Sequence, residues 1–425
     1  MKQLSRIVTL ILLLGLFVSP AQAFTSLRIF GDGISTTTNN VIVTDYPQTY
    51  GTNYYGLREC NGRVWVEVLA QRLGLGANSI TNVNWSNASN NWSYYGQYSF
   101  NLMTNINHFA KPADAGTALF VLWVNNADFV NDMANVYNSS GSQNSTNWNN
   151  AINQSLTNHW NIITNLYYSK GCRTLIAPNA VDITEIPAYD GLVINNPATR
   201  NFIRQQVINF NTRYAALLNQ ARALGLTIYE PDFFTLLDNV LTNASAYGLT
   251  NALNSQGVSS DALDILYPNL SMNGAGANYI FWDATDPSAK LHEIMADEAL
   301  QIIAPAQISG IAVIGNITQP TVNQLTIANM PVGLNGFVDG STNVGTSWAP
   351  VANITGTSTT QVISFTAPPL PIFVMSGSSS LPFSGSGSGS GSGSQNNNNT
   401  VASTNSVPGE VETYHLRFPL AWNWP

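Results

Sequence analysis

Short apolar runs alternate with longer amphipathic segments over the first three quarters of the chain. The run at 118–124, ALFVLWV, is apolar throughout, which is typical of a strand buried on both faces. Similar runs at 27–30, 174–178 and 226–230 predict three more strands. Strands that alternate with helices predict a parallel sheet with helices on both faces. Functional groups in such a sheet collect beyond the carboxyl ends of its strands.

The segments between these runs carry the apolar spacing of helices. Residues 64–74 keep this spacing and end at a glycine, which predicts a helix that stops there. A long polar helix is expected at about 145–169, and two more are expected near 197–223 and at about 288–303. Together with the strands, these segments predict an α/β domain at 24–306.

The pattern changes after about residue 306. Residues 309–425 show short alternating segments with turn residues and no helical spacing, which predicts a β-rich, Ig-like sandwich domain. Within it, the Gly-Ser and Asn tract at 384–399 has no side chains to bury, so we expect a flexible segment. The closing stretch TYHLRFPLAW regains an apolar pattern, which favours a long loop inside this domain over a linker.

The first 23 residues have the pattern of a signal peptide. Lys2 and Arg6 precede the apolar run IVTLILLLGLFV, and SPAQA then offers a small-residue cleavage site after Ala23. The alternative is a membrane anchor, but the run is short for a membrane span. Since no second apolar stretch of about 20 residues follows, we expect a secreted protein without a membrane span in its mature chain. Its location would be extracellular, periplasmic or at the cell surface.

Charge and cysteine content narrow the function classes. Only 9% of residues are charged, and the net charge of −8 with a pI near 4.9 argues against nucleic acid, which needs a basic face. Cys60 and Cys172 are expected near opposite ends of the sheet, so we predict no disulfide between them. Four histidines and two cysteines without ligand spacing indicate no transition-metal site, and we expect no cofactor.

The stretch at 28–38, RIFGDGISTTT, raises the question of chemistry. An apolar strand runs into Gly-Asp, as in the nucleophile turn of an ester hydrolase. Six stretches, in order, resemble the sequence blocks of the GDSL, or SGNH, esterases and lipases, in their plant-lipase-like branch. They are IFGDGIS at 29–35 and the segments 61–75, 91–109, 119–129, 174–189 and 281–294. This resemblance covers residues 24 to about 305. It implies a flavodoxin-like fold with a five-stranded parallel sheet and hydrolysis of carboxylic esters by a Ser-His-Asp triad.

The residues at the family's catalytic positions depart from its pattern. Gly33 stands at the nucleophile position and has no oxygen with which to attack. The family pattern Asp-x-x-His-Pro is matched by Asp283 to Pro287, which retains the acid as Asp283 and puts Asp286 at the histidine position. A carboxylate with a pKa near 4 does not exchange protons at neutral pH as imidazole does. Ser35, expected to cap the next helix, and His292, expected to be structural, are the less favoured replacements.

The predicted oxyanion site is also altered. The family's Gly-x-Asn-Asp is matched by Asn125 to Asp128, so Ala127 stands at the position of the oxyanion-binding Asn. Asn126 would replace it if the loop shifted by one residue. Gly96 matches the glycine of the second block, and Tyr95 beside it is expected to fill part of the pocket.

The sequence therefore predicts a degenerate hydrolase that binds a small-molecule ester or a glycan. Loss of the nucleophile or the base alone costs a triad hydrolase about a million-fold in kcat. Aromatic side chains near the predicted pocket favour a glycan, although core packing would also explain them: Trp92, Tyr94, Tyr95, Tyr98 and Trp123. Two alternatives stay open, an active esterase with relocated groups and a structural surface protein.

A cation site is a further alternative. Four acids are expected near one edge of the sheet, and their oxygens would suit Ca²⁺: Asp32, Asp128, Asp283 and Asp286. The simpler interpretation puts Asp32 and Asp128 in backbone hydrogen bonds and leaves Asp286 in solvent.

Overall fold

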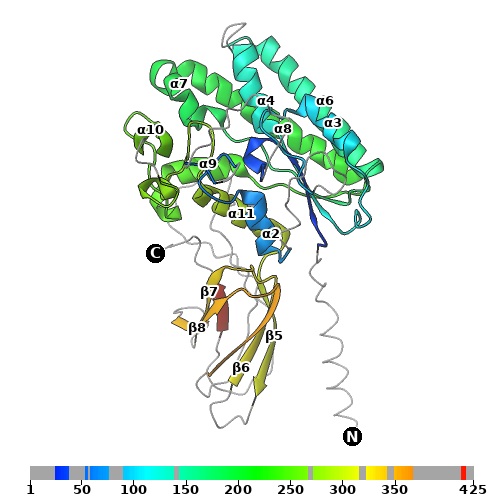
Figure 1. Cartoon of the computed structure of the whole chain (residues 1–425), viewed down its shortest axis with the longest axis vertical. Coiled ribbons are helices and arrows are strands. Elements are labelled where there is room, and N and C mark those ends of the chain that lie inside the picture. Colours follow the sequence, from blue (N-terminus) through cyan, green and yellow to red (C-terminus); the bar gives the residue numbers. More distant parts are fainter. Residues whose placement is uncertain are drawn as a thin grey trace. The chain divides into compact units, whose positions relative to one another are not determined.

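The computed structural model describes most of the chain in two units. The described residues are 24–37, 53–55, 58–75, 90–137, 143–266, 271–314, 322–341, 349–366 and 413–417. A helix-rich unit extends from Phe24 to Ile303, and a strand-rich unit begins at Ala304 (Figure 1). The predicted signal peptide at 1–23 and the Gly-Ser and Asn tract at 384–399 lie outside the described residues.

The helix-rich unit is built on a parallel sheet whose strand order is β1-β2-β3-β4. The four strands are β1 (Leu27–Gly31), β2 (Leu119–Trp123), β3 (Thr174–Ile176) and β4 (Thr227–Tyr229). All five residues of β2 are buried, as its continuous apolar pattern predicts. The predicted α/β class and the positions of the four strands are confirmed.

The expected fifth strand is wrong for the described residues. Beside β1, which lies at one edge of the sheet, one parallel bridge joins Ile29 to Asn91. Ile29 N donates to Asn90 O at 2.8 Å, and Trp92 N donates to Ile29 O at 2.7 Å. The Asn91 side chain then accepts a hydrogen bond from Ser93 N at 2.9 Å. This local side-chain bond turns the backbone away from β1 after a single bridge.

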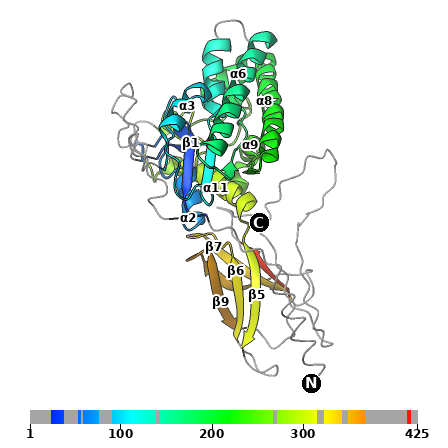
Figure 2. The same cartoon turned by 90° about the vertical axis from the view of Figure 1, so that its right-hand side faces the viewer.

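The helices form two groups around the sheet. α3, α6 and α8 pack side by side, while α2 packs against α11, and β1 runs between the two groups (Figures 1 and 2). The longer helices agree with the predicted segments to within two residues. The helices are α2 (Trp65–Arg72), α3 (Ser99–His108), α4 (Asn125–Asp132), α6 (Ser145–Tyr168), α7 (Asp190–Asn195), α8 (Pro197–Ala223), α9 (Phe233–Thr242), α10 (Ala262–Leu266) and α11 (Ala289–Ile303). The shorter turns are η1 (Gly33–Ser35), η3 (Met133–Tyr137), η4 (Ile183–Glu185), η5 (Pro187–Tyr189), η6 (Ala244–Tyr247) and η7 (Ala275–Asn278).

An aromatic cluster fixes the carboxyl end of β2. The ring centroids of Trp65 and Trp123 lie 5.6 Å apart, and Phe233 lies 5.6 Å from Trp65 and 5.0 Å from Trp123. All three side chains are buried and meet edge to face, an arrangement that stabilises aromatic pairs beyond the area they bury. The cluster ties α2, β2 and α9 together at the edge where functional groups are expected.

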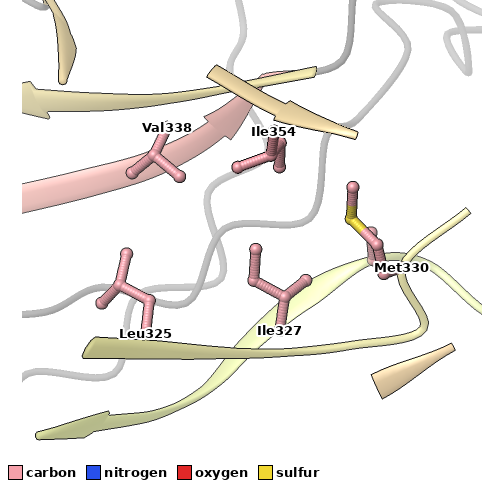
Figure 3. Close-up of a cluster of buried hydrophobic side chains, with 6 residues drawn as sticks. Leu325, Ile327, Met330, Val338 and Ile354 are labelled. Atoms are coloured by element: carbon pink, nitrogen blue, oxygen red, sulfur yellow. The ribbon is translucent and has the colours of Figure 1, made fainter. Parts of the chain in front are cut away.

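The strand-rich unit contains two antiparallel sheets of three strands. One has the order β5-β6-β9 and the other β10-β7-β8. Leu325 and Ile327 on β6 face Val338 on β7 and Ile354 on β8, with Met330 at one end of the cluster (Figure 3). The predicted Ig-like sandwich stays a prediction. The strands are β5 (Gln307–Ile314), β6 (Val322–Ala328), β7 (Asn335–Ser341), β8 (Ala349–Thr355), β9 (Thr360–Thr366) and β10 (Thr413–Arg417).

The two cysteines are buried and free. Cys60 Sγ donates to Gly62 O at 3.0 Å, and Cys172 Sγ lies 3.6 Å from Thr174 O. Burial raises the pKa of both thiols, which disfavours the reactive thiolate. Within the described part of the chain, no helix has the length and apolar character that a membrane span requires.

The ion pair between α2 and α11 yields a stability prediction. Arg72 Nε lies 2.9 Å from Asp297 Oδ1, and both side chains are more than nine-tenths buried. Because Asp297→Ala leaves the Arg72 charge buried without this partner, we expect it to cost about 3 kcal/mol of unfolding free energy. The double variant Arg72→Met/Asp297→Ala should lose clearly less than the single variant. Chemical denaturation of the natural chain, Arg72→Met, Asp297→Ala and the double variant measures this coupling, and equal losses in Asp297→Ala and the double variant would contradict it.

Candidate active site

The turn after β1 is closed by a buried aspartate. Asp32 Oδ1 accepts a hydrogen bond from Ile34 N at 3.2 Å and so caps η1, and the backbone of Ala127 also bonds to Asp32. Burial raises the pKa of Asp32 to about 7, although these backbone hydrogen bonds act to lower it. The Asp of the Gly-Asp motif thus shapes the turn, in agreement with the simpler interpretation of Asp32.

Glu59 occupies the position from which a nucleophile would extend. A Cβ placed on Gly33 would overlap Glu59 Oε2 and would approach Tyr95 Cδ2 to 3.4 Å. Glu59 is only 7% exposed, so its carboxylate is enclosed at this point. Glycine at position 33 therefore leaves room for a carboxylate that comes from another segment. Tyr95 lies beside the same position, as the sequence predicts.

Asp283, the retained acid, has new partners. Its Oδ1 accepts hydrogen bonds from the backbone N–H groups of Thr285 and Asp286, each at 2.9 Å. Its Oδ2 accepts the hydroxyl of Tyr54 at 3.0 Å. Burial, together with the nearby Asp283 charge, raises the pKa of Tyr54 and keeps this phenol protonated as a donor. Asp283 thus holds a turn and a tyrosine where the family's acid would orient a histidine.

Asp286, at the histidine position, is buried rather than solvated, which corrects that expectation. It is 6% exposed, and its Oδ2 accepts the Thr285 hydroxyl at 2.6 Å. Burial first, and then the charges of Glu59 and Asp283, raise the pKa of Asp286 well above its ordinary value. The Glu59 and Asp286 carboxyl groups thus act on each other electrostatically where the family has serine and histidine.

The replacement catalytic residues considered from the sequence are both structural. Ser35 Oγ accepts a hydrogen bond from Trp65 Nε1 at 3.0 Å and is fully buried. His292 Nδ1 accepts from Trp65 N at 3.2 Å, and burial lowers the pKa of His292 to about 3. Ser35 belongs to η1 and does not cap a described helix, so that expectation is wrong. Both residues hold α2 in place.

At the predicted oxyanion site, the amide of Asn126 is half satisfied. Asn126 Oδ1 accepts a hydrogen bond from Val181 N at 3.0 Å, whereas the buried Nδ2 group has no partner among the described residues. Ala127, at the family's Asn position, contributes a backbone bond to Asp32. Gly96 has a φ of +71°, the left-handed region that favours glycine, and its role as an oxyanion donor stays a prediction.

A cavity of about 40 Å³ opens beside Asn126 at the carboxyl end of the sheet. Apart from Asn126 and Thr285, its wall is apolar or aromatic. Phe233, Leu236 and Leu237 from α9 form one side, and Leu291 and Met295 from α11 form another. The remaining wall residues are Ile34, Trp123, Val181, Ile186, Phe281 and Pro287.

The acidic residues do not form the cation site considered from the sequence. Asp128 accepts Ser99 N at 2.8 Å and the Ser155 hydroxyl, so both of its oxygens serve the α3–α6 contact. Among the described residues, the acids whose oxygens lie within 4.8 Å of one another are Asp182, Glu185 and Asp238. Arg200 and Arg204 form ion pairs with this group, which makes it an ion-pair network.

The aromatic residues near the site divide into core and surface. Trp92 and Trp123 are 5% and 1% exposed and belong to the core, in agreement with the core-packing interpretation of these residues. Tyr95 is 43% exposed and Phe100 is 61% exposed. Tyr98 stacks on Phe100 with ring centroids 5.5 Å apart and planes only 8° from parallel. We call Tyr95, Tyr98 and Phe100 the aromatic patch.

Glu59 and Tyr54 are the site residues that the sequence did not reveal. Both lie on the segment before α2, which carries no motif and no regular periodicity. Gly33, Asp283 and Asp286 were predicted, and the structure brings Asp283 and Asp286 into one turn whose charges act on each other.

The geometry defines a hydrolase-type α/β domain whose site lies at the carboxyl edge of a parallel sheet. The family model described as GDSL-like Lipase/Acylhydrolase matches residues 27–299. The chain therefore belongs to the GDSL-like lipase/acylhydrolase family, and the resemblance drawn from its sequence blocks is confirmed. A search of curated proteins finds no match.

The buried Asp286 predicts a dependence of stability on pH. Its pKa is raised in the folded state, so the folded chain binds more protons than the unfolded chain between pH 4 and the raised pKa. Stability from this group is thus present near pH 4 and is lost as the pH rises, by up to about 1.4 kcal/mol per pH unit. Asp286→Asn should remove this loss.

Thermal unfolding between pH 4 and pH 8 tests this expectation. Asp286→Asn should match the natural chain near pH 4 and be more stable at pH 8. The exposed Asp264 provides the control, since Asp264→Asn should follow the natural curve. A variant Asp286→Asn that loses stability at pH 8 would show that the ionised carboxylate is stabilising.

Proposed function

We propose that this chain is a member of the GDSL-like lipase/acylhydrolase family that binds a ligand without serine hydrolysis. The observation that carries the proposal is the Glu59 carboxylate at the position of a side chain on residue 33. A glycine alone would leave an empty nucleophile position. Here the buried Glu59 carboxylate, from another segment, fills that position. The site has therefore gained a side chain as well as lost the serine.

The sizes of the effects support this proposal. Removal of the nucleophile or of the base each lowers kcat by about a million-fold in a triad hydrolase. Oxyanion donors and substrate binding alone retain a rate acceleration of about 10³–10⁴ over the reaction in water. The Ser35 hydroxyl is bonded to Trp65, and His292 bonds a backbone N–H group, so neither offers the missing function. An active esterase with relocated groups is therefore the weaker alternative.

Secretion forms part of the proposal. Lys2, Arg6, the apolar run that follows and the small-residue site at Ala23 support export of the mature chain. A ligand-binding role outside the cytoplasm agrees with a surface rich in Asn, Ser and Thr and poor in charge.

The direct test uses a fluorophosphonate probe and p-nitrophenyl acetate. We expect the purified chain to remain unlabelled by the probe and to hydrolyse the ester no faster than a heat-denatured sample, because position 33 carries no serine and the Ser35 hydroxyl is bonded to Trp65. A related active hydrolase treated in parallel serves as the positive control. Stoichiometric labelling, or turnover at rates typical of lipases, would refute the proposed loss of serine hydrolysis.

Restoring the triad should require a change at Glu59. In Gly33→Ser/Asp286→His, the new Cβ overlaps the Glu59 carboxylate, so we expect almost no activity. Adding Glu59→Ala frees the space and should raise kcat/KM for p-nitrophenyl acetate by at least about 100-fold over the double variant. Glu59→Ala alone is the matched control and should stay inactive. Equal activity in the double and triple variants would show that Glu59 does not block the position.

The aromatic patch favours a glycan as one candidate ligand. Tyr95 and Phe100 present exposed rings, and the Tyr98–Phe100 pair is already stacked, so its faces lose little freedom on binding. Flat aromatic faces suit the apolar faces of sugar rings. This candidate uses the surface beside the site and does not require the catalytic groups.

A glycan array followed by substitution tests the patch. We expect binding of at least one glycan, and Phe100→Ala should weaken it by about three- to tenfold. Tyr168 is 69% exposed on α6, which makes Tyr168→Ala a matched control without an effect. Absence of any bound glycan, or equal losses in both variants, would remove the patch as a glycan site.

A further inference from the structure

The segment that carries Glu59 belongs to no helix or strand among the described residues. We call its described residues, 53–55 and 58–62, the Glu59 segment. Tyr55 N donates to Cys60 O at 2.9 Å, so the segment folds back on itself in bends and turns. Stretches outside the helices and strands open at a lower free energy than the core does. The Glu59 segment can therefore move without unfolding the sheet.

Neutral groups fix both ends of the Glu59 segment. Asn61 Nδ2 donates to Met272 O at 3.0 Å, and Asn61 Oδ1 accepts from Ala289 N at 2.8 Å. At the other end, Trp282 Nε1 donates to Asn53 O at 3.0 Å. Amide and indole groups do not titrate, so these contacts do not respond to pH. The middle of the segment, where Glu59 lies, instead faces ionisable groups.

Two carboxyl groups on the facing turn act against Glu59. The charges of Glu59 and Asp283 both oppose ionisation of Asp286. The turn holds its own two acids in place, because Asp286 N donates to Asp283 Oδ1 at 2.9 Å and Trp282 N donates to Asp286 O at 2.8 Å. Glu59 comes from a separate segment, so it is the carboxylate that can leave when the repulsion grows.

The other ionisable groups on the surrounding elements do not offset a new negative charge. Arg58 of the segment is committed to Glu67 on α2, with Nε 2.6 Å from Oε2. Lys290 on α11 pairs with Glu293 at 3.5 Å. The remaining groups are phenols, a thiol and a further acid, namely Tyr54, Tyr95, Cys60 and Asp261. Ionisation of Asp286 therefore adds a repulsive charge that these groups do not neutralise.

We infer that the Glu59 segment is a pH-sensitive closure, which covers the position over Gly33 while Asp286 is protonated and loosens when Asp286 ionises. The sign follows from linkage, because the Glu59 charge lies near Asp286 in the closed form and moves away in the open form. The closed form thus binds the proton more tightly, and opening gains up to about tenfold per pH unit as the pH rises. This regulation of access goes beyond the proposed function, since it holds for any ligand of the site.

The two natural cysteines provide the test in the full chain. Cys60 lies in the Glu59 segment and Cys172 lies two residues before β3, and both thiols are buried and free. We expect labelling of Cys60 by 2,2′-dithiodipyridine, relative to Cys172, to rise by at least about tenfold between pH 5 and pH 8. The ratio cancels the common dependence of thiol reactivity on pH, and Cys172 reports unfolding of the domain. Peptide mass spectrometry separates the two labelled sites.

Two neutral substitutions should each remove the response. Asp286→Asn lacks the carboxyl group whose ionisation drives the opening, so the labelling ratio should stay as low at pH 8 as at pH 5. Glu59→Gln removes the opposing charge and should behave in the same way, which keeps the inference testable if Asp286→Asn does not fold. The exposed Asp264 provides the matched control, since Asp264→Asn should keep the full rise.

Three results would overturn the inference. The first is a labelling ratio in the natural chain that does not change with pH. The second is an equal rise at both cysteines, which would mean that the whole domain unfolds. The third is a full rise in both Asp286→Asn and Glu59→Gln. Thiol labelling involves no ester, so ester turnover would refute the proposed function and leave this result unaffected.

Discussion

The contact between the Glu59 carboxylate and the bare backbone of Gly33 is the constraint on which the site depends. Strand β1 and the cap by Asp32 place residue 33 at the carboxyl edge of the sheet, where any side chain would reach the site. Glycine leaves that space, and Glu59 fills it. Burial of Asp286, followed by the charge of Glu59, then raises the pKa of Asp286. A histidine at position 286 would carry a proton as a cation, whereas a carboxylic acid there carries it in a neutral form.

The changes at positions 33, 59 and 286 are coupled through charge. A serine at 33 would collide with Glu59, and an ionised Asp286 would be repelled by both Glu59 and Asp283. Asp283 keeps its own place because two backbone N–H groups and the Tyr54 hydroxyl bind its oxygens. The retained acid is thus explained by local hydrogen bonding and needs no catalytic role. Retention of one triad member is consequently weak evidence for activity in this chain.

Sequence patterns predicted the regular elements well because each depends on local spacing. The apolar run of β2 and the long helices α6 and α8 carry their periodicity in the chain itself. The missing fifth strand was not predictable in this way, because Asn91 ends the pairing through a side-chain bond that depends on its neighbours. The sequence left Trp92 and Trp123 open between core packing and a glycan site, because the position of an aromatic residue in a block does not show whether its side chain is buried.

Site residues that belong to a sequence motif could be predicted. Site residues that reach the site through a contact between distant segments could not. Gly33, Asp283 and Asp286 lie in motifs whose spacing ties them to the ends of strands or helices. Glu59 reaches Gly33 across 26 positions from a segment without periodicity, and only the fold brings them together. Likewise, the sequence does not show that Asn126 Oδ1 accepts a hydrogen bond from Val181 N, or that Asn126 Nδ2 lacks a partner among the described residues. The family's fold accommodates these replacements, because Glu59 and Asp286 are both buried beside the turn that follows β1.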